Sequence, residues 1–223
     1  MKEIEIVFLG GGTAFYEVFE IICRINLIQK KYKIIAILDD NIELHGKQLN
    51  GIIVAGNLEK VIEYPNAKFV FGIGSMKTRL IRNKIMSKLC IELSRFESII
   101  HPQTYIDSSV TIQPGCIIHP GVSIGNDVII DPFVVIAVNS AIGPYTHIKS
   151  FAMITSLVVI LSNAKIGKSV FVGSCSCVTE GIEVGNGAMI GAGTVISRNI
   201  PEGTFFLGNP ARMINKFEIP QDF

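Results

Sequence analysis

The chain has 223 residues, of which 48% are hydrophobic and 17% are charged, and its formal net charge is +1 at pH 7. This length predicts one or two domains, and the balanced charge provides no field that attracts nucleic acid or an anionic membrane. No apolar run approaches the roughly 20 residues that span a bilayer, so we expect no membrane insertion. The absence of a signal-peptide pattern and the odd number of cysteines, five, favour a cytoplasmic protein with reduced thiols.

The first hundred residues follow the pattern of an α/β domain. An amphipathic helix is predicted from about Ala14 to Gln29, with Thr13 as its expected N-cap and a run of three glycines before it. Apolar runs predict strands at Ile4–Leu9, Tyr32–Leu38, Ile52–Ala55, Phe69–Ile73 and Ser98–Ile100. Strand, glycine turn, helix and strand, in this order, form the start of a Rossmann-like unit.

Three turns follow predicted strands: Gly10–Gly12, Asp39-Asp40 and Gly72–Gly74. In an open α/β sheet they would converge on one edge, where ligands bind. Glycines let backbone N–H groups approach a phosphate at a helix N-terminus, and the acidic pair could hydrogen-bond a ribose or a base. Phe15 stands where the last glycine of G-x-G-x-x-G would be, which disfavours an NAD site. A turn without a ligand and a nucleotide bound in another mode both stay open.

A basic segment follows the third turn. Its charges indicate a solvated helix face or, as the alternative, a phosphate clamp. They are Lys77, Arg79, Arg82, Lys84 and Lys88.

The second half of the chain has a period of six. From Ile106 to Ile196 every sixth residue is Ile or Val, sixteen times in succession, and the fourth residue after each of them is small or β-branched and uncharged. This period is too short for helical repeats and predicts a β-helix, in which each hexad forms one strand and one turn. Stacked coils cover each other's edges, so the array is stable only as a series.

The order of these motifs resembles one family. The glycine turn, Leu38-Asp39-Asp40, Gly72-Ile73-Gly74, Ile100-His101-Pro102, the hexads and Gly208-Asn209-Pro210-Ala211-Arg212 are similar to the bacterial sugar O/N-acetyltransferases of the bacillosamine and sialic acid type. The resemblance covers essentially the whole chain. It implies an α/β Rossmann-like nucleotide-sugar-binding domain (residues 1–100) followed by an all-β left-handed parallel β-helix with a C-terminal tail (residues 101–223), which is the acyltransferase domain.

The resemblance also implies ligands and site residues. In that family the N-terminal domain holds a nucleotide-linked sugar, and acetyl-CoA lies along the β-helix between the subunits of a homotrimer. Residues implied in sugar-nucleotide binding are Gly10, Gly11, Gly12, Asp39, Asp40, Gly74 and Lys77. Acetyl-CoA or another acyl-CoA would contact His147, Ser174, Gly191 and Ala192, where glycines that serve only as turn residues are the simpler interpretation. No metal is expected, because only His119 and His147 lie within the hexads.

The sequence departs from the family at the catalytic base. The family has a His in a hexad V-x-H-[DE]-C-x, followed by I-G-x-x-x-H. By local similarity, Ile142–His147 matches the second motif, so that Val138 takes the place of the base and Asn139 that of its acidic partner. Counting hexads from His-Pro places Pro144 at the base position instead. Both alignments lack the usual base. His147 therefore becomes the predicted catalytic residue, either as a base or as a hydrogen-bond donor to the thioester carbonyl. The alternative is a histidine without a catalytic role, at a corner that faces solvent or a subunit interface.

The combined prediction is a CoA-dependent N-acyltransferase. It would transfer an acetyl or larger acyl group to the amine of a nucleotide-linked amino sugar for a surface glycan. A neutral amine is itself nucleophilic, whereas a hydroxyl needs a base, so the missing His favours an amine acceptor. The alternatives are a catalytically inactive nucleotide-sugar-binding trimer and an O-acetyltransferase. Bulky apolar hexads between Ile148 and Lys165 would pack the trimer or line a pocket for a larger acyl group.

Overall fold

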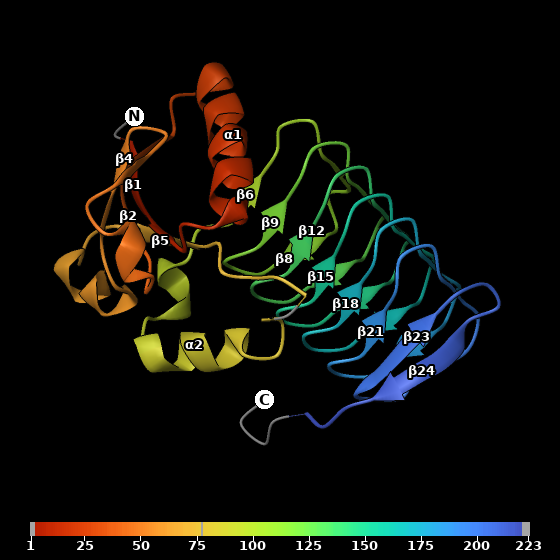
Figure 1. Cartoon of the computed structure of the whole chain (residues 1–223). Helices are drawn as coiled ribbons and strands as arrows, with labels where there is room; N and C mark the ends of the chain where they lie inside the picture. Colours follow the sequence, from red (N-terminus) through yellow and green to blue (C-terminus); the bar gives the residue numbers. More distant parts are fainter. Residues whose placement is uncertain (1–2, 77, 220–223) are drawn as a thin grey trace.

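The computed structural model describes residues 3–76 and 78–219, which form an α/β domain and a parallel β-helix (Figure 1). The α/β domain contains one five-stranded sheet in the order β3-β4-β2-β1-β5, in which only β3 is antiparallel to its neighbour. The strands are β1 (Ile4–Leu9), β2 (Tyr32–Leu38), β3 (Gln48–Leu49), β4 (Ile52–Gly56) and β5 (Lys68–Phe71). The predicted Rossmann-like arrangement of the first two strands and their helix is confirmed.

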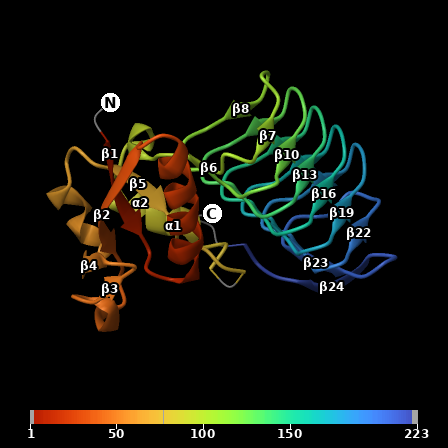
Figure 2. The same cartoon turned by 90° about the horizontal axis from the view of Figure 1, so that it is seen from above.

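Helix α1 (Thr13–Ile28) packs on one face of this sheet. Its buried side chains Phe15, Val18, Ile21 and Ile22 contact the sheet and the beginning of the β-helix together. Figures 1 and 2 both show α1 between the sheet of the α/β domain and the coils of the β-helix. The prediction of Thr13 as N-cap was wrong, because Gly12 occupies the cap position and no side chain caps the helix.

The remaining helical segments are short. Helix α2 follows β5, and single 3-10 turns connect the strands. Their bounds are α2 (Arg82–Leu89), η1 (Ile42–Leu44), η2 (Leu58–Glu63) and η3 (Leu93–Arg95).

The β-helix consists of short strands that form three sheets, parallel throughout except that the last strand, β24, is antiparallel to β23. They are β6 (Ile99–Ile100), β7 (Tyr105–Ile106), β8 (Thr111–Ile112), β9 (Ile117–Ile118), β10 (Ser123–Ile124), β11 (Ile129–Ile130), β12 (Val135–Ile136), β13 (Ala141–Ile142), β14 (His147–Ile148), β15 (Met153–Ile154), β16 (Val159–Ile160), β17 (Lys165–Ile166), β18 (Phe171–Val172), β19 (Cys177–Val178), β20 (Glu183–Val184), β21 (Met189–Ile190), β22 (Val195–Ile196), β23 (Thr204–Leu207) and β24 (Arg212–Lys216).

Each coil takes three hexads, as Ile117 pairs with Val135, 18 residues further along. The first sheet runs from β6 through β9, β12, β15, β18 and β21 to β23 and β24; the second runs from β7 to β22, and the third from β8 to β20. Strand β6 therefore belongs to the first sheet. The prediction of Ser98–Ile100 as the last strand of the α/β domain was wrong, because Ile99 lies one coil before Ile117 and completes the β-helix register.

The six-residue pattern describes the core of the β-helix. The periodic Ile and Val side chains from Ile118 to Ile196 are buried, and small side chains alternate with them. Ser140 and Ser176 at the small positions donate hydrogen bonds to the backbone carbonyls of Thr155 (2.9 Å) and Gly191 (2.8 Å). Such partners offset the cost of burying a hydroxyl, which is why these positions accept Ser and Thr but no charged residue.

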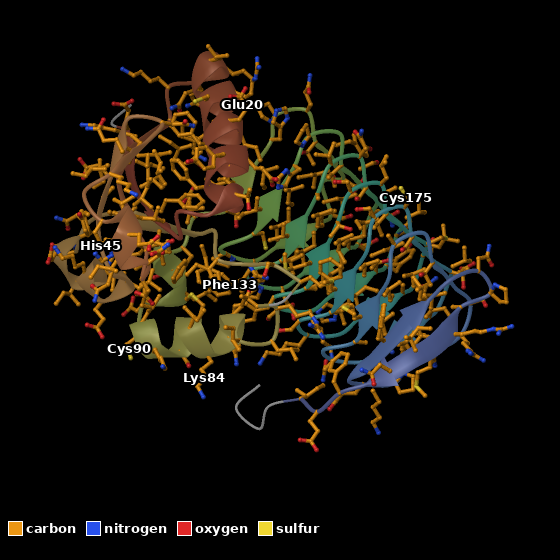
Figure 3. The ribbon with its side chains drawn as sticks, viewed as in Figure 1. Glu20, His45, Lys84, Cys90, Phe133 and Cys175 are labelled. Atoms are coloured by element: carbon orange, nitrogen blue, oxygen red, sulfur yellow. The ribbon has the colours of Figure 1, made fainter. Side chains whose placement is uncertain are left out.

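Arg82 connects the α/β domain to the β-helix. Its guanidinium is 1% exposed and donates hydrogen bonds to the carbonyls of Ile73 (2.9 Å), Phe151 (2.9 Å) and Phe133 (3.1 Å). The Phe133 and Phe151 rings stack at 4.9 Å on corners of adjacent coils (Figure 3 labels Phe133). Burial lowers the pKa of Arg82 to about 10, so the side chain stays charged at neutral pH. The prediction of a solvated basic face therefore fails at Arg82, which is an internal tie.

We expect Arg82→Met to destabilise the protein by about 3 kcal/mol, because three carbonyl groups lose their donor and two of them lie inside the domain junction. Urea denaturation followed by circular dichroism measures the loss. Lys88→Met, at an exposed position of the same helix, is the matched control and should change stability by less than about 0.5 kcal/mol. Equal stability of the two variants would contradict the assigned role.

Candidate active site

The three predicted turns do lie along one edge of the α/β sheet. They follow β1, β2 and β5, which are neighbours in the order β2-β1-β5. Both oxygens of Asp39 accept backbone hydrogen bonds, from Gly11 N–H (2.6 Å) and Asn41 N–H (2.7 Å). Asp40 accepts from Leu58 N–H (2.9 Å) and is exposed. The structure thus gives Asp39 a part in holding the glycine turn, which the sequence did not indicate.

The glycines of this edge differ in their surroundings. A Cβ at Gly10 would lie 2.8 Å from Ile73 Cγ1, and one at Gly74 would lie 3.1 Å from Arg82 Nε, so close packing explains both. A Cβ at Gly12 would meet nothing within 4 Å. Gly12 is also the N-cap of α1, whose first turn carries no acidic residue. The edge is therefore open to a ligand at Gly12. Lys77 lies outside the residues that the structure describes.

A small cavity of about 140 Å³ lies between this edge and the first sheet of the β-helix. The α/β domain lines it with Thr13, Glu17 and the Gly72–Gly74 turn, and the β-helix lines it with His119 and Met153. A larger groove of about 580 Å³ continues between α1 and the coils (Figure 3 labels Glu20 on this helix). Its polar lining comprises Glu17, Glu20, Arg24, His101, Gln103 and His119. Glu17 and His119 line both the cavity and the groove. The two hollows therefore form one candidate site.

His119 is the most enclosed titratable side chain of this groove. It is 6% exposed, and its Nε2 lies 3.9 Å from Glu17 Oε2. Burial lowers the pKa of His119 below the ordinary 6.5, and the Glu17 carboxylate opposes this shift only in part. His101 stands one coil earlier and is 9% exposed; burial lowers its pKa too, and its Nδ1 accepts a hydrogen bond from Gln103 N–H (3.1 Å). Both imidazoles are therefore neutral at pH 7.

Sequence reasoning gave these two histidines little weight. A usable signal was present, because 101 and 119 differ by 18 residues, which is one full coil. The contact with Glu17 could not be read from the sequence, since it depends on how α1 docks on the β-helix.

His147 lies elsewhere, on β14 in the third sheet. Its Nε2 is 3.0 Å from Asp131 Oδ1, and both side chains are partly exposed. The sequence analysis named no acidic partner for His147, and the structure supplies Asp131 from the preceding coil. Of the two proposed base positions, Val138 lines the inter-domain groove, whereas Pro144 lies at the corner between the second and third sheets.

The residues expected at the CoA arm do not meet His147 within one chain. Ser174 and Ala192 lie at the corner between the first and second sheets, and Gly191 follows β21 of the first sheet. Ser174 Oγ donates to Thr155 Oγ1 at 3.1 Å, and the space beside Gly191 is filled by Leu207. The structure therefore brings together the glycine turns and His119, and it separates His147 from Ser174, Gly191 and Ala192.

Two features are absent from residues 3–76 and 78–219. No group of three or more His, Cys, Asp or Glu side chains in that part is arranged to hold a metal ion. None of the helices there combines the length and the hydropathy of a membrane span.

Two family models match the chain. The PglD N-terminal domain matches residues 5–89, and the GMPPB C-terminal domain matches residues 100–202. No curated protein matches.

Solved structures match over almost the whole length. A His-to-Asn mutant of perosamine N-acetyltransferase from Caulobacter crescentus, in complex with CoA and GDP-perosamine, has a TM-score of 0.82 and 21% identity, with 95% of this chain and 97% of that chain covered. The acetyltransferase domain of PglB from Neisseria gonorrhoeae has a TM-score of 0.81 and 24% identity, with 94% and 99% covered. The chain has the two-domain fold of these sugar N-acetyltransferases. The predicted fold class, a Rossmann-like α/β domain followed by a left-handed parallel β-helix, is confirmed by this likeness.

The buried histidines give this fold a testable pH dependence. The pKa of His119 and that of His101 are lowered in the folded state, so protonation favours the unfolded chain. The stability that this linkage contributes is complete above pH 6.5 and is lost as the pH falls through the lowered folded pKa. We expect His119→Gln to reduce the loss of unfolding free energy between pH 7 and pH 5, measured by urea titration. An unchanged loss would show that the imidazole is solvated in the folded protein.

Proposed function

We propose that this protein is a cytoplasmic CoA-dependent acyltransferase whose acceptor is the amine of a nucleotide-linked amino sugar, made for a surface glycan. One observation carries the proposal. The edge of the α/β sheet that carries the three turns lies beside the β-helix, and both line one hollow. Gly72–Gly74 line it on one side and His119 on the other. The structural neighbours support it, since the perosamine N-acetyltransferase was solved with both CoA and GDP-perosamine.

The nucleotide sugar would bind at the edge formed by the three turns. The open N-terminus of α1 at Gly12 provides backbone N–H groups and the positive end of the helix dipole for a phosphate. Asp40 is exposed and would accept a hydrogen bond from a ribose or base, while Asp39 holds Gly11 in place. Gly10 and Gly74 would allow the close packing, and Lys77 would supply a positive charge. The sugar would then extend into the hollow toward His119.

The acyl-CoA would lie along the β-helix in a homotrimer. Apolar side chains are exposed on the second sheet and at its corners, namely Tyr105, Tyr145, Leu157, Val159 and Leu161. Such a set requires a cover, and it agrees with the expectation that bulky hexads pack the trimer. In a ring each subunit packs one side against a different side of the next. His147 of one subunit would then approach Ser174, Gly191 and Ala192 of its neighbour.

His147 would act on the thioester in this arrangement. Asp131 orients the imidazole through Nε2, which leaves Nδ1 to face the acyl group. In the imidazolium form Nδ1–H could donate to the thioester oxygen as that oxygen becomes negative. In the neutral form Nδ1 can accept a proton instead.

The proposal predicts acyl transfer by the purified protein. It is incubated with acetyl-CoA and a panel of UDP-, dTDP- and GDP-linked 3-amino and 4-amino sugars, and release of free CoA thiol is followed. We expect turnover with at least one member and no turnover with the corresponding hydroxyl sugar. Tight nucleotide-sugar binding without any turnover would favour the catalytically inactive alternative, and turnover with the hydroxyl sugar alone would favour O-acetylation.

A second prediction concerns His147. His147→Ala should lower kcat by about 100-fold, as expected for the loss of one donor to a developing oxyanion, while the KM for the nucleotide sugar changes little. Asp131→Asn is the matched comparison and should have a smaller effect, because the imidazole remains. Steady-state thiol release at saturating acceptor measures both. A kcat equal to that of the unsubstituted protein would exclude His147 from the reaction.

A further inference from the structure

We propose that His119, paired with Glu17 of α1, is the general base that removes the proton from the acceptor amine. The inference rests on the proposed function and names the residue that handles its proton. It gives this role to a histidine of the inter-domain groove and leaves His147 on the third sheet with the thioester.

The location of His119 is the first argument. It lines both the small cavity beside Gly72–Gly74 and the larger groove along α1. A ligand that enters from the glycine turns must therefore pass this imidazole. His147 lines neither hollow. Val138 also lines the groove but has no group that could accept a proton.

The bonding of His119 is the second argument. Its backbone is held on both sides, since its N–H donates to Ile136 O (2.9 Å) and its carbonyl accepts from Thr104 Oγ1 (3.2 Å). Within residues 3–76 and 78–219 its imidazole makes no hydrogen bond, so both ring nitrogens are available to a ligand. The ring of His101 differs, because its Nδ1 already accepts from Gln103 N–H. A buried imidazole on a fixed backbone, with an unused acceptor, is suited to proton transfer.

The electrostatics agree with this role. The charged and titratable groups around His119 are Glu17, Glu20 and Arg24 on α1, His101 on the preceding coil, and Arg82 beside the small cavity. Burial keeps the imidazole neutral and able to accept a proton at pH 7. Once it is protonated, the Glu17 carboxylate 3.9 Å from Nε2 stabilises the imidazolium. Burial and the Glu17 carboxylate thus shift the pKa of His119 in opposite directions, and burial has the larger effect.

The neutral amine nitrogen attacks the thioester carbonyl carbon, a C–N bond forms, and the carbonyl oxygen becomes an oxyanion. His119 takes one proton from the positively charged nitrogen. The oxyanion collapses, the C–S bond breaks, and the CoA thiolate receives the proton from His119. The products are the amide and free CoA thiol, and the histidine is restored to its neutral form.

The test compares His119→Gln with the unsubstituted protein on the acceptor identified by the panel. We expect kcat at pH 7 to fall by about 100-fold, the usual contribution of a general base. The deficit should shrink as the pH rises, because hydroxide can then remove the proton from the positively charged nitrogen in place of His119. The dissociation constant for the nucleotide sugar should stay within about threefold, which shows that the groove is intact. Lys88→Met, at an exposed position of α2 that lines neither hollow, is the control and should retain the pH profile of the unsubstituted protein.

The outcomes distinguish the proposed function from the role of His119. Turnover by the unsubstituted protein together with an unaltered pH profile of His119→Gln would overturn the inference and leave the proposed function standing. Absence of turnover by the unsubstituted protein with every acceptor would overturn the proposed function and the inference with it. Glu17→Gln gives a further check, since removal of the carboxylate should lower kcat by about tenfold with little change in KM.

Discussion

The candidate site depends on one buried cation. The guanidinium of Arg82 donates to a carbonyl of the turn after β5 and to carbonyls of two β-helix corners, and no carboxylate neutralises it among the bonds that the described residues make. A buried charge is costly unless its hydrogen bonds are satisfied with good geometry. The three carbonyls must therefore stay where they are. Since Gly74 packs on Arg82, the edge of the sheet that carries the glycine turns is held at a set distance from the coils.

The corners that meet Arg82 carry aromatic side chains on a backbone like that of other corners, where a positive φ recurs every six residues, as at Asp127, Asn139 and Tyr145. Phe133 and Phe151 both have positive φ values, of 63°, a conformation that costs a non-glycine residue roughly 1 kcal/mol. Their rings stack on each other at 4.9 Å, and Phe133 lies edge-on against Phe71 and Phe96 of the α/β domain. Aromatic contacts of this kind contribute about as much as the strain costs. The aromatic side chains of these corners thus pack against the α/β domain. This packing holds α1 beside His119.

The sequence predicted what depends on local patterns. Alternation of apolar runs and glycines was sufficient for β1, α1 and β2, and the sixfold repeat of Ile and Val was sufficient for the coils, because each of these signals lies within a few residues. Contacts between segments that are far apart in the sequence were not predicted. Arg82 looked like a surface charge because its partners are carbonyls, which any residue could supply. Asp131 was missed because the pairing with His147 joins adjacent coils at a spacing of 16 residues, not 18.

The place of His119 restricts the acceptor. Neighbouring strands of a sheet are about 4.8 Å apart, and β9, which precedes His119, is one coil nearer to α1 than β12, which precedes Val138. A hydrogen bond to nitrogen spans only about 3 Å, so a single amine position cannot serve both coils. An amine deprotonated by His119 must therefore lie close to α1 and to the glycine turns. A sugar that carries its amine near the nucleotide end would satisfy this geometry, whereas one whose amine reaches the Val138 coil would meet only an apolar wall.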